Sequence, residues 1–531
     1  MDTCLEHNQE KDFLNIINQM LNELDQNLKF GRGTLCDMKF MYQKLAEEKQ
    51  DRCLAVIYEV MKENYAVEIY LFGVILRETR DKKAVHYVIK LLESKEYPLW
   101  ERLNDSRQFR RFLFTDNLLK ENEKYHSIRH MYEGFLSEIR QEMNCCYSPV
   151  PFKKRKKKII ISVSQIVTIY HAPTAYLVHI CRCLEKMEYD VECFVCHFHG
   201  VNGYWNWEQG FLDQNLMCET GPFEAVLGDV KIKGYNLELH DSDYIETLRK
   251  AVEMIWKEKP EYVLEIGSET ILAGLCRGFT TTVTMGMTGA LPVTNAQLVI
   301  SLEERSKEKQ KVWETLLDDG QMVVFMNFAV HKSGEQKRKR RYQKKDFGIP
   351  EDTFVLILAG NRLDMEIKED FETVLFQILE QDEHFAVVVI GRCEELEKRF
   401  LEGEWKERFY FLGNRTDFRE VIGIGDVFIN PPRQGGGTGG LFAIMEGVPV
   451  ITLGDCDVEL NSGKEFVCGS IEEMPKLVYK YYKDKEFMDR QKENCRKQAI
   501  AKTNVDNEKE LWKIHDAVEK YTGRWEENDT F

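Results

Sequence analysis

The sequence lacks both a long apolar run and an excess of positive charge. No stretch approaches the ~18 apolar residues that a membrane-spanning helix needs, and the opening MDTCLEHNQEKDF does not have the pattern of a secretory signal peptide. The 73 Lys and Arg residues against 89 Asp and Glu residues give a formal net charge of −16. Nucleic acids and anionic membranes are bound by dominant positive fields, which this balance excludes. We therefore expect a cytoplasmic protein with no transmembrane segment and no nucleic-acid partner.

Composition also excludes a disordered chain and a disulfide framework. Hydrophobic residues make up 43% and aromatic residues 11%, which is enough apolar material to offset chain entropy. The 15 cysteines are odd in number and scattered through a chain with no export signal, which is typical of reduced thiols. Cys193, Cys196 and His197 have the spacing of a c-type haem attachment site, but YDVECFVCHF predicts a buried strand whose two thiols point to opposite faces. We predict neither haem nor zinc there.

Glycine is scarce at the beginning of the chain. Residues 1–150 contain four of the 34 glycines, and apolar residues recur there at helical spacing, as at Phe13, Ile16, Ile17 and Met20. This predicts an all-helical domain over 1–152 without a catalytic cluster. Three roles stay open for it, namely docking, acceptor recognition and self-association into a homo- or hetero-oligomer.

From residue 153 onward, short β-branched runs alternate with amphipathic stretches. Such alternation predicts parallel β-α-β units and doubly wound sheets. A basic run at 337–345 separates two series, so we predict an α/β fold with two Rossmann-like parallel sheets after the all-α domain. The expected domains are 1–152, 153–335, 336–505 and a C-terminal helical tail over 506–531. The strand candidates are 159–163, 191–195, 262–267, 281–286 and 297–301 in the first series and 353–360, 384–391, 408–413, 426–431 and 448–454 in the second.

A glycine run in the second sheet is the sharpest candidate site. A predicted strand ends at Pro431-Pro432, and the run GGGTGG at 435–440 then leads into the helix LFAIME. So many glycines are costly in chain entropy unless the backbone approaches something closely. Peptide N–H groups at a helix start suit a diphosphate, and Arg362, directly after strand 353–360, adds a guanidinium suited to bidentate phosphate contact. Neither a P-loop nor a dinucleotide fingerprint is present.

The first sheet offers two candidates for a catalytic base. His171 lies between a predicted strand and a helix that begins near Pro173 and Thr174, and its imidazole titrates near working pH. Glu269 follows another strand and is the competing base, or else a carboxylate that complements a helix N-terminus. No Asp-x-Asp pattern indicates a divalent-metal site, so we expect no metal and no bound cofactor.

Two other features admit two interpretations each. The basic run KKRKKK at 153–158 is either a nuclear-localisation or lipid-binding segment or a solvated linker into a strand, and we favour the linker. The aromatic residues Tyr204, Trp205 and Trp207 either stack on a sugar or pack in the interior, and packing is the more frequent role for such rings.

The two predicted sheets, the Gly-Asn-Arg-Leu after one strand and the NPPRQGGGTGG segment before a Gly-Val-Pro-Val-Ile strand resemble GT-B glycosyltransferases. The resemblance covers roughly 155–520. It implies that the sheets face each other across a cleft, with the acceptor side on 153–335 and the nucleotide-sugar donor side on 336–505. It also implies that His171 acts as a base or contacts the donor, while Glu269 remains the competing catalytic candidate from its position alone. The implied donor-binding residues are Gly360, Asn361, Arg362, Leu412, Gly413, Asn430, Arg433, Gln434, Gly435, Gly436, Gly437, Thr438, Gly439 and Gly440.

The implied activity is transfer of a hexosyl group from a nucleoside-diphosphate sugar to a hydroxyl of an acceptor glycan or protein. The family resemblance further implies that the donor is a UDP-sugar. Many retaining members carry a Glu-x7-Glu pair, and the corresponding positions here are Gln434 and Phe442, with Glu446 one turn later. The stereochemistry is therefore open between inverting and variant retaining chemistry. Two alternatives remain, a non-catalytic transferase-like subunit that binds a partner or glycosylated protein, and a sugar-nucleotide epimerase.

Overall fold

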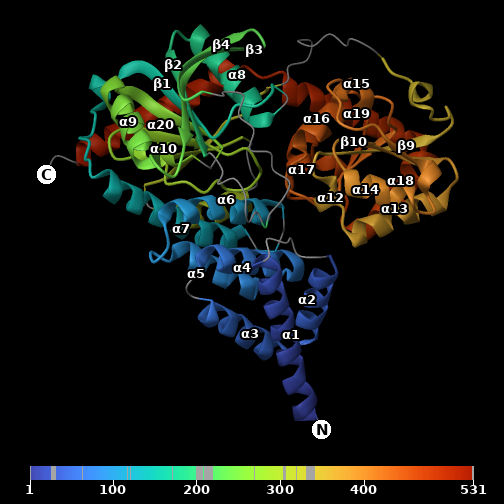
Figure 1. Ribbon diagram of the computed structural model, residues 1–531. Helices are drawn as coiled ribbons and strands as arrows, with labels where there is room; N and C mark the ends of the chain where they lie inside the picture. The colour runs from blue at the N-terminus through green and yellow to red at the C-terminus, as the bar shows by residue number, and fades with distance from the viewer. Residues whose placement is uncertain are drawn as a thin grey trace. The chain divides into compact units, whose positions relative to one another are not determined.

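The chain folds into helices and two mainly parallel sheets (Figure 1). The computed structural model describes residues 2–528 except 26–31, 62–63, 116–117, 120, 170, 199–206, 208–218, 268–269, 303–306, 319 and 331–340. The chain forms two compact units. The first contains residues 1–145, 198–213 and 239–245, and the second contains residues 146–197, 214–238 and 246–531.

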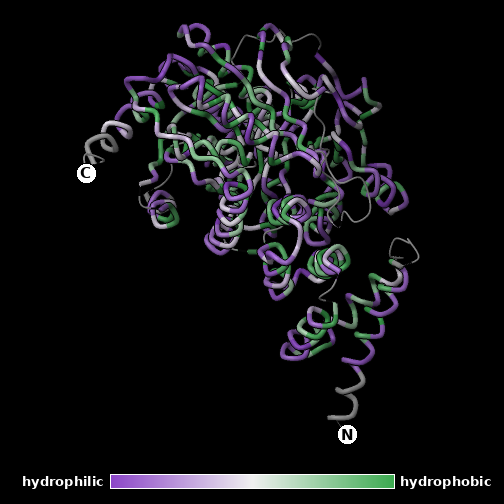
Figure 2. The backbone as a smooth tube through the Cα atoms, turned by 60° about the vertical axis from the view of Figure 1, so that its left-hand side comes forward, coloured by the Kyte–Doolittle hydropathy of each residue, from purple (hydrophilic) through white to green (hydrophobic). Residues whose placement is uncertain are grey.

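The first unit confirms the helical region expected from scarce glycine. Side-chain caps begin two of its helices, because Asn64 accepts the N–H of Val67 and Asp81 accepts the N–H of Lys83. Hydrophobic and hydrophilic residues alternate along these helices (Figure 2), which lets one face of each be buried. The helices are α1 (Asp2–Asp25), α2 (Arg32–Lys44), α3 (Glu47–Val60), α4 (Tyr65–Thr79), α5 (Lys82–Glu93), α6 (Leu99–Thr115) and α7 (Glu121–Met143).

Trp207 belongs to this helical unit although the sequence places it in the predicted second domain. Its side chain is fully buried, and a β-carbon on Gly73 of α4 would lie 2.3 Å from the indole. The ring also lies 5.9 Å from that of Phe112, and Arg77 donates a hydrogen bond to the Trp207 carbonyl. Trp207 is thus a packing residue, as favoured above, whereas Tyr204 and Trp205 lie outside the described residues.

The first sheet has eight strands in the order β3-β4-β2-β1-β5-β6-β7-β8. The pairings from β2 through β1, β5, β6 and β7 to β8 are all parallel, and β3 and β4 form an antiparallel hairpin, so the expected doubly wound sheet is confirmed. Its strands are β1 (Lys156–Val163), β2 (Asp190–Phe198), β3 (Gly221–Leu227), β4 (Val230–Leu239), β5 (Pro260–Ile266), β6 (Thr281–Met285), β7 (Leu298–Ser301) and β8 (Met322–Phe325). Its helices are α8 (Ala172–Lys186), α9 (Tyr244–Glu258), α10 (Ile271–Cys276) and α11 (Lys307–Leu316).

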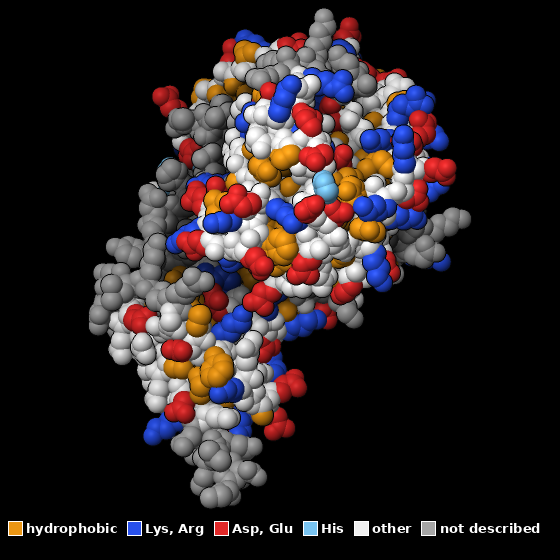
Figure 3. Space-filling view, turned by 90° about the vertical axis from the view of Figure 1, so that its right-hand side faces the viewer, with side chains coloured by type: hydrophobic (Ala, Val, Ile, Leu, Met, Phe, Trp, Pro, Cys, Tyr) orange, Lys and Arg blue, Asp and Glu red, His pale blue; other side chains and the backbone are white. Residues whose placement is uncertain are grey.

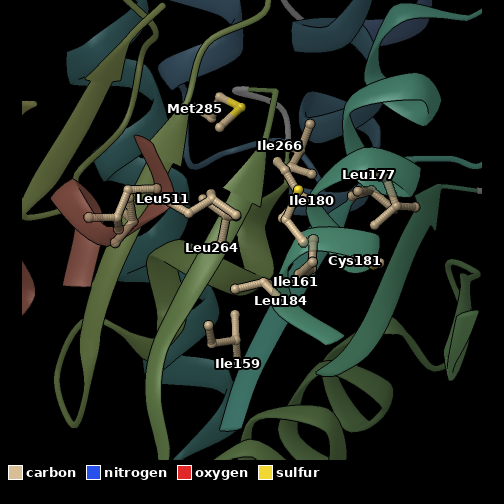
Figure 4. Close-up of a cluster of buried hydrophobic side chains, with 14 of the residues drawn as sticks. Ile159, Ile161, Leu177, Ile180, Cys181, Leu184, Leu264, Ile266, Met285 and Leu511 are labelled. Atoms are coloured by element: carbon tan, nitrogen blue, oxygen red, sulfur yellow. The ribbon is translucent and has the colours of Figure 1, made fainter. Parts of the chain in front are cut away.

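The last helix of the chain, α20 (Asn507–Asn528), packs into the core of this first sheet. Figure 1 shows α20 among the elements of that sheet, and Figure 4 shows Leu511 in the same cluster as Leu264 of β5. Ile514 and Val518 are fully buried there as well. The helix predicted as a C-terminal tail is therefore an integral layer of the first sheet domain.

The free thiols of the CxxCH segment lie inside this domain. Cys193 is fully buried in the same core cluster as Cys181, and Cys196 on the other side of β2 is buried too. Burial raises the pKa of the Cys193 thiol well above its usual range. Among the described residues, no group of three or more His, Cys, Asp and Glu side chains is placed to hold a metal ion.

The basic run at 153–158 is only partly a solvated linker. Its last residues begin β1, and the Lys158 side chain is 6% exposed, with its ammonium 2.9 Å from Glu258, 3.0 Å from Glu192 and 3.2 Å from Asp190. Burial by itself lowers the pKa of the Lys158 ammonium. The hydrogen bonds to these carboxylates outweigh burial, so the pKa of Lys158 lies above its ordinary value. The linker interpretation is therefore wrong at Lys158, which is an internal ion-pair centre.

The second sheet has five parallel strands in the order β11-β10-β9-β12-β13. Its strands are β9 (Phe354–Ala359), β10 (Phe385–Ile390), β11 (Phe409–Phe411), β12 (Val427–Ile429) and β13 (Val450–Ile451). The helices are α12 (Leu363–Glu366), α13 (Glu369–Gln381), α14 (Glu394–Leu401), α15 (Phe418–Ile422), α16 (Gly437–Met445), α17 (Asp457–Ser462), α18 (Met474–Lys483) and α19 (Lys485–Thr503). Five 3-10 turns complete the described elements, at Phe152–Lys154, Lys344–Phe347, Lys406–Arg408, Lys464–Phe466 and Ile471–Glu473.

The face of the molecule drawn in Figure 3 carries charges of both signs. Figure 3 shows acidic and basic side chains interspersed there. None of the helices in the described residues is long and apolar enough to span a membrane.

Candidate functional site

The candidate site lies where the strand order of the second sheet reverses. From β9 the chain moves to β10 and β11 on one side, and β12 returns to the other side of β9. Ligands of open parallel sheets bind at such a switch point, beyond the carboxyl ends of the two strands. The segments that follow these strands are 360–362 and 430–436, which contain Arg362 and the first part of the glycine run.

A buried carboxylate holds these two segments together. Glu366 of α12 has a side chain that is 2% exposed, and its two oxygens accept from Arg362 at 2.8 Å and from Arg433 at 2.7 Å. Arg362 also donates to the carbonyl of Gln434 at 3.0 Å. Burial lowers the pKa of the Arg362 guanidinium, with Glu366 opposing that shift and Arg433 adding to it. The carboxylate thus keeps two neighbouring guanidinium groups in place.

The Arg433 guanidinium is buried and donates its hydrogen bonds to groups of the protein. It is 5% exposed, and besides Glu366 it donates to the Ala359 carbonyl at 2.7 Å and to the Asn430 side chain at 2.8 Å. Asn430 is itself buried and donates to Thr452 at 3.2 Å. In this geometry both residues position the loop, and their predicted contact with a donor stays untested. Arg362, with a side chain 17% exposed, is the guanidinium nearer to solvent.

Much of the glycine run is explained by close packing within the protein. A β-carbon on Gly436 would lie 2.7 Å from the Arg433 guanidinium, and Gly436 also has a φ of +78°, which side chains rarely adopt. On Gly437 it would lie 2.4 Å from the Asn461 amide, and on Gly440 2.8 Å from Val458. The close approach that the glycines imply is therefore in large part an approach to Arg433 and to helix α17.

The beginning of α16 still presents backbone N–H groups. Gly435 donates to Asp457 at 2.8 Å, whose other oxygen accepts from Gly289 of the same compact unit. Within the described residues, no acceptor is recorded for the N–H groups of Gly436, Gly437 and Thr438, the last of which is half-buried. These N–H groups at the first turn of a nine-residue helix form a positive pole for an anion.

The charges around this pole cancel when only side chains are counted. Arg362 and Arg433 carry two positive charges, while Glu366 and Asp457, which also faces Arg362 electrostatically, carry two negative ones. The attraction for an anion therefore rests on the N–H groups of α16 and on the part of Arg362 that is accessible.

The remaining predicted donor residues lie along the same edge of the sheet. Gly360 donates to Ile390, and a β-carbon there would lie 2.4 Å from the Arg433 guanidinium, while Asn361 is exposed. Leu412 donates to the Val389 carbonyl after β11, and Gly413 has a φ of +62°. Gly439 lies in α16, where a β-carbon would be 3.3 Å from the Phe428 ring. Their roles in binding a nucleotide stay predictions.

His171 lies at the corresponding switch point of the first sheet. There β1 has β2 on one side and β5 on the other, and His171 is the residue immediately before α8. Its Nδ1 lies 3.2 Å from the hydroxyl of Thr174, which also accepts the N–H of Val167 at 3.1 Å. The Thr174 hydroxyl in the first turn of α8 thus contacts one nitrogen of the imidazole ring and is itself held by the Val167 N–H. Glu269 lies outside the described residues.

A buried carboxylate near Glu269 was not among the sequence candidates. Glu265 of β5 is 1% exposed and accepts from both the N–H and the hydroxyl of Thr270, at 3.0 and 2.8 Å, and from Thr284 at 2.7 Å. It anchors the segment that follows β5. Glu366 and Asp457 were missed as well, although the four-residue spacing of Arg362 and Glu366 is a detectable signal for an ion pair on one helix turn.

Of the two positions that hold glutamates in many retaining transferases, the second is a packing residue here, and the nearby Glu446 is held in an ion pair. Phe442 is 8% exposed, and its ring lies 6.1 Å from that of Phe418. Glu446 is buried and accepts from Arg419 at 2.9 Å. Neither residue supplies a carboxylate to the loop at 430–436.

Solved structures with related folds were found at low identity. An O-GlcNAc transferase mutant from Thermobaculum terrenum is 12% identical, with 97% of this chain and 98% of that chain covered and a TM-score of 0.49. HepE of Anabaena in complex with UDP and glucose is 12% identical over 68% of this chain and 99% of its own, with a TM-score of 0.47. WaaG, a glycosyltransferase involved in lipopolysaccharide biosynthesis, is 13% identical over 68% and 99%, with a TM-score of 0.43. No family model and no curated protein matches the chain.

At these sequence identities, similarity to a solved structure describes the fold alone. The fold of this chain is established by the strand orders of its own two sheets. Both sheets have the Rossmann-like reversal of strand order, and both follow an all-helical region in one chain. Two consecutive Rossmann-like sheets after a helical region confirm the predicted α/β fold with two parallel sheets and an all-α region.

Proposed function

We propose that the protein is a glycosyltransferase that moves a sugar from a nucleoside-diphosphate sugar, by resemblance a UDP-sugar, to an acceptor hydroxyl. The observation that carries this proposal is the switch point of the second sheet, where Arg362 and the first N–H groups of α16 meet. A diphosphate bound there has both a guanidinium and a helix N-terminus to stabilise the negative charge that develops as it leaves. No metal is required by this arrangement.

His171 is the base in this proposal, with Glu269 as the alternative. Contact between its Nδ1 and Thr174 leaves the ring in a defined orientation at the switch point of the first sheet. A neutral imidazole in that position takes the proton from the incoming hydroxyl. The acceptor is proposed to be a protein, because the 150-residue helical unit is larger than recognition of a small glycan needs. Docking of a partner or self-association through that unit belongs to the same proposal, as does a location in the cytoplasm.

Nucleotide binding tests the donor site. UDP at about 100 times its Kd stabilises the folded protein by about 2.7 kcal/mol, which a thermal-shift assay detects. Arg362→Gln is expected to weaken UDP about ten- to a hundredfold, since a hydrogen bond from a charged group contributes about 1.5–3 kcal/mol. Arg392→Gln is the matched control, because Arg392 follows β10 as Arg362 follows β9 but has a side chain that is 60% exposed. Equal binding of UDP by both variants would remove the site from consideration.

Turnover separates the proposal from its two alternatives. Release of UDP from a UDP-sugar in the presence of acceptor is expected to fall about 10²–10⁴-fold in His171→Gln, while UDP binding stays unchanged. Binding without any sugar transfer or hydrolysis across a panel of nucleotide sugars identifies a non-catalytic subunit. Conversion of the nucleotide sugar without an acceptor, followed by NMR of the product, identifies an epimerase.

A further inference from the structure

A cavity lies at the amino-terminal edge of the first sheet, opposite the edge that holds His171. It has a volume of about 370 Å³ and is bounded by the starts of β1 and β6, by the segment before β7 and by α20. Strands β1, β5 and β6 are parallel, so their amino ends share this edge and their carboxyl ends share the edge of His171. The cavity is therefore separate from the loops assigned to the transfer reaction, and its size is at the lower end of small-molecule pockets.

The lining of this cavity is positively charged. Arg155 and Arg277 both line it, and none of the described lining residues is acidic. Arg155 is held by the protein, because it donates to the carbonyls of Val150 and Glu261 and to the hydroxyl of Thr281, at 2.8–3.0 Å. The Arg277 guanidinium makes no hydrogen bond or ion pair with any residue that the structure describes. One fixed and one uncommitted guanidinium thus face the same cavity.

The rest of the lining is apolar with a few hydroxyl groups. Phe279 and Val150 are buried, and Pro149 adds a third apolar surface. Tyr521 of α20 lies at the wall, where burial raises the pKa of its phenol and Arg277 opposes that shift. A molecule bound here has apolar surface for its body, a phenol for one polar contact and Arg277 for one charge.

We propose that this cavity binds a small organic carboxylate with an apolar body. One planar guanidinium matches one carboxylate in a bidentate contact, and apolar walls favour a ligand that buries hydrocarbon there. A free phosphate has no apolar body and carries more charge than one uncommitted arginine neutralises. This inference does not depend on the proposed transferase activity.

Binding here has a structural consequence, because the wall is shared between the sheet and the last helix. Thr281 of β6 lies 3.2 Å from Thr522 of α20, hydroxyl to hydroxyl, at the back of the cavity. A ligand that contacts both Arg277, which directly follows α10, and Tyr521 of α20 also connects the first sheet domain to the last helix. Occupancy therefore stabilises the docking of α20 on the first sheet, as any ligand specific to the folded state does.

The experiment pairs carboxylates with neutral analogues. Indole-3-acetate, 2-naphthoate and 4-phenylbutyrate, each beside its carboxamide, and inorganic phosphate are titrated into the full-length protein at up to about 1 mM, a range suited to weak small-molecule affinities. Ligand-observed NMR measures binding, and hydrogen–deuterium exchange measures protection of residues 507–523. At least one carboxylate is expected to bind, with its carboxamide about tenfold weaker or more, and to slow exchange in α20.

Two arginine variants decide the assignment. Arg277→Gln is expected to weaken the carboxylate about ten- to a hundredfold, and Tyr521→Phe to reduce the protection of α20. Arg496→Gln, at a 72% exposed arginine of α19, is the control and keeps wild-type affinity. The proposal is overturned if no carboxylate binds saturably, if a carboxamide or phosphate binds as tightly, or if Arg277→Gln binds like Arg496→Gln. UDP binding is expected to be unaffected by Arg277→Gln, which keeps this result distinct from the donor-site tests.

Discussion

Replacing Glu366 by glutamine tests whether one buried carboxylate organises the donor-side switch point. Glutamine keeps the shape of the side chain but removes the charge that lies between Arg362 and Arg433. Its amide nitrogen then faces a guanidinium donor, so one of the two hydrogen bonds becomes a repulsive contact. Both guanidinium groups remain buried without their common counter-ion.

The magnitude follows from the burial of the pair. Removing one partner of a buried ion pair costs about 3–5 kcal/mol, and we expect the lower end because glutamine retains one acceptor oxygen. About 3 kcal/mol corresponds to an increase of about a hundredfold in the population of the locally open state. The opening is expected in β9 and α12, since Arg433 also bonds to the carbonyl of Ala359.

Hydrogen–deuterium exchange over residues 354–366 is the appropriate assay, because a chain with several domains has no single well-defined unfolding transition. Glu394→Gln is the control, since Glu394 is 77% exposed and pairs with Arg392 only at 3.4 Å. It is expected to change stability by less than about 0.5 kcal/mol. Exchange in Glu366→Gln that matches this control would refute the reasoning, because the carboxylate would then contribute nothing to the order of the loop.

Two further changes test packing and charge elsewhere. Lys158→Met is expected to destabilise the first sheet domain by about 1.5–3 kcal/mol at neutral pH, because it removes charged hydrogen bonds to three partly exposed carboxylates, of which Asp190 keeps Lys233 and Glu258 keeps Lys156. The hydrogen bond to Lys158 lowers the pKa of Glu258 below 4.5, so this stabilisation is complete above that unfolded-state value and is lost as the pH falls through the folded-state pKa. Protection of β1 against hydrogen–deuterium exchange, corrected for the intrinsic exchange rate at each pH, should therefore converge between the two proteins in acid, and a difference that stays constant with pH would contradict the assignment. Gly73→Ala places a β-carbon 2.3 Å from a buried indole and is expected to destabilise the helical unit by about 1–3 kcal/mol. Gly134→Ala, with no atom within 4 Å, is expected to stabilise its helix by up to about 1 kcal/mol, and hydrogen–deuterium exchange over α4 and α7 in the two variants checks the difference in sign.

The elements of the second sheet were predictable because its strands are short apolar runs bounded by turn residues. The run predicted at 353–360 is strand Phe354–Ala359, and the run at 384–391 is Phe385–Ile390. Strands buried on both faces leave a continuous β-branched signal that needs no knowledge of tertiary contacts. The hairpin of β3 and β4 is missing from the sequence prediction, although Gly228-Asp229 between two alternating segments is a typical two-residue turn.

The function of individual arginines was not predictable in the same way. Arg362 and Arg433 both follow strands of the same sheet, and their sequence contexts look equally suited to phosphate. The structure separates them by partners that are distant in sequence, since Arg433 bonds to Glu366 and Ala359 on another segment. The glycines were ambiguous for the same reason, because a close approach to Arg433 or Asn461 leaves the same pattern as an approach to a ligand.

The return of α20 to the first sheet has a consequence for how the protein is made. Leu511, Ile514 and Val518 complete a core whose other members lie between residues 152 and 330. A ribosome therefore releases the first sheet with an uncovered apolar face and must synthesise the whole second sheet before the covering helix emerges. Chains that stop before residue 507 keep that face exposed, which marks them for aggregation or degradation. The core of the first sheet can therefore close only after the second sheet has been synthesised.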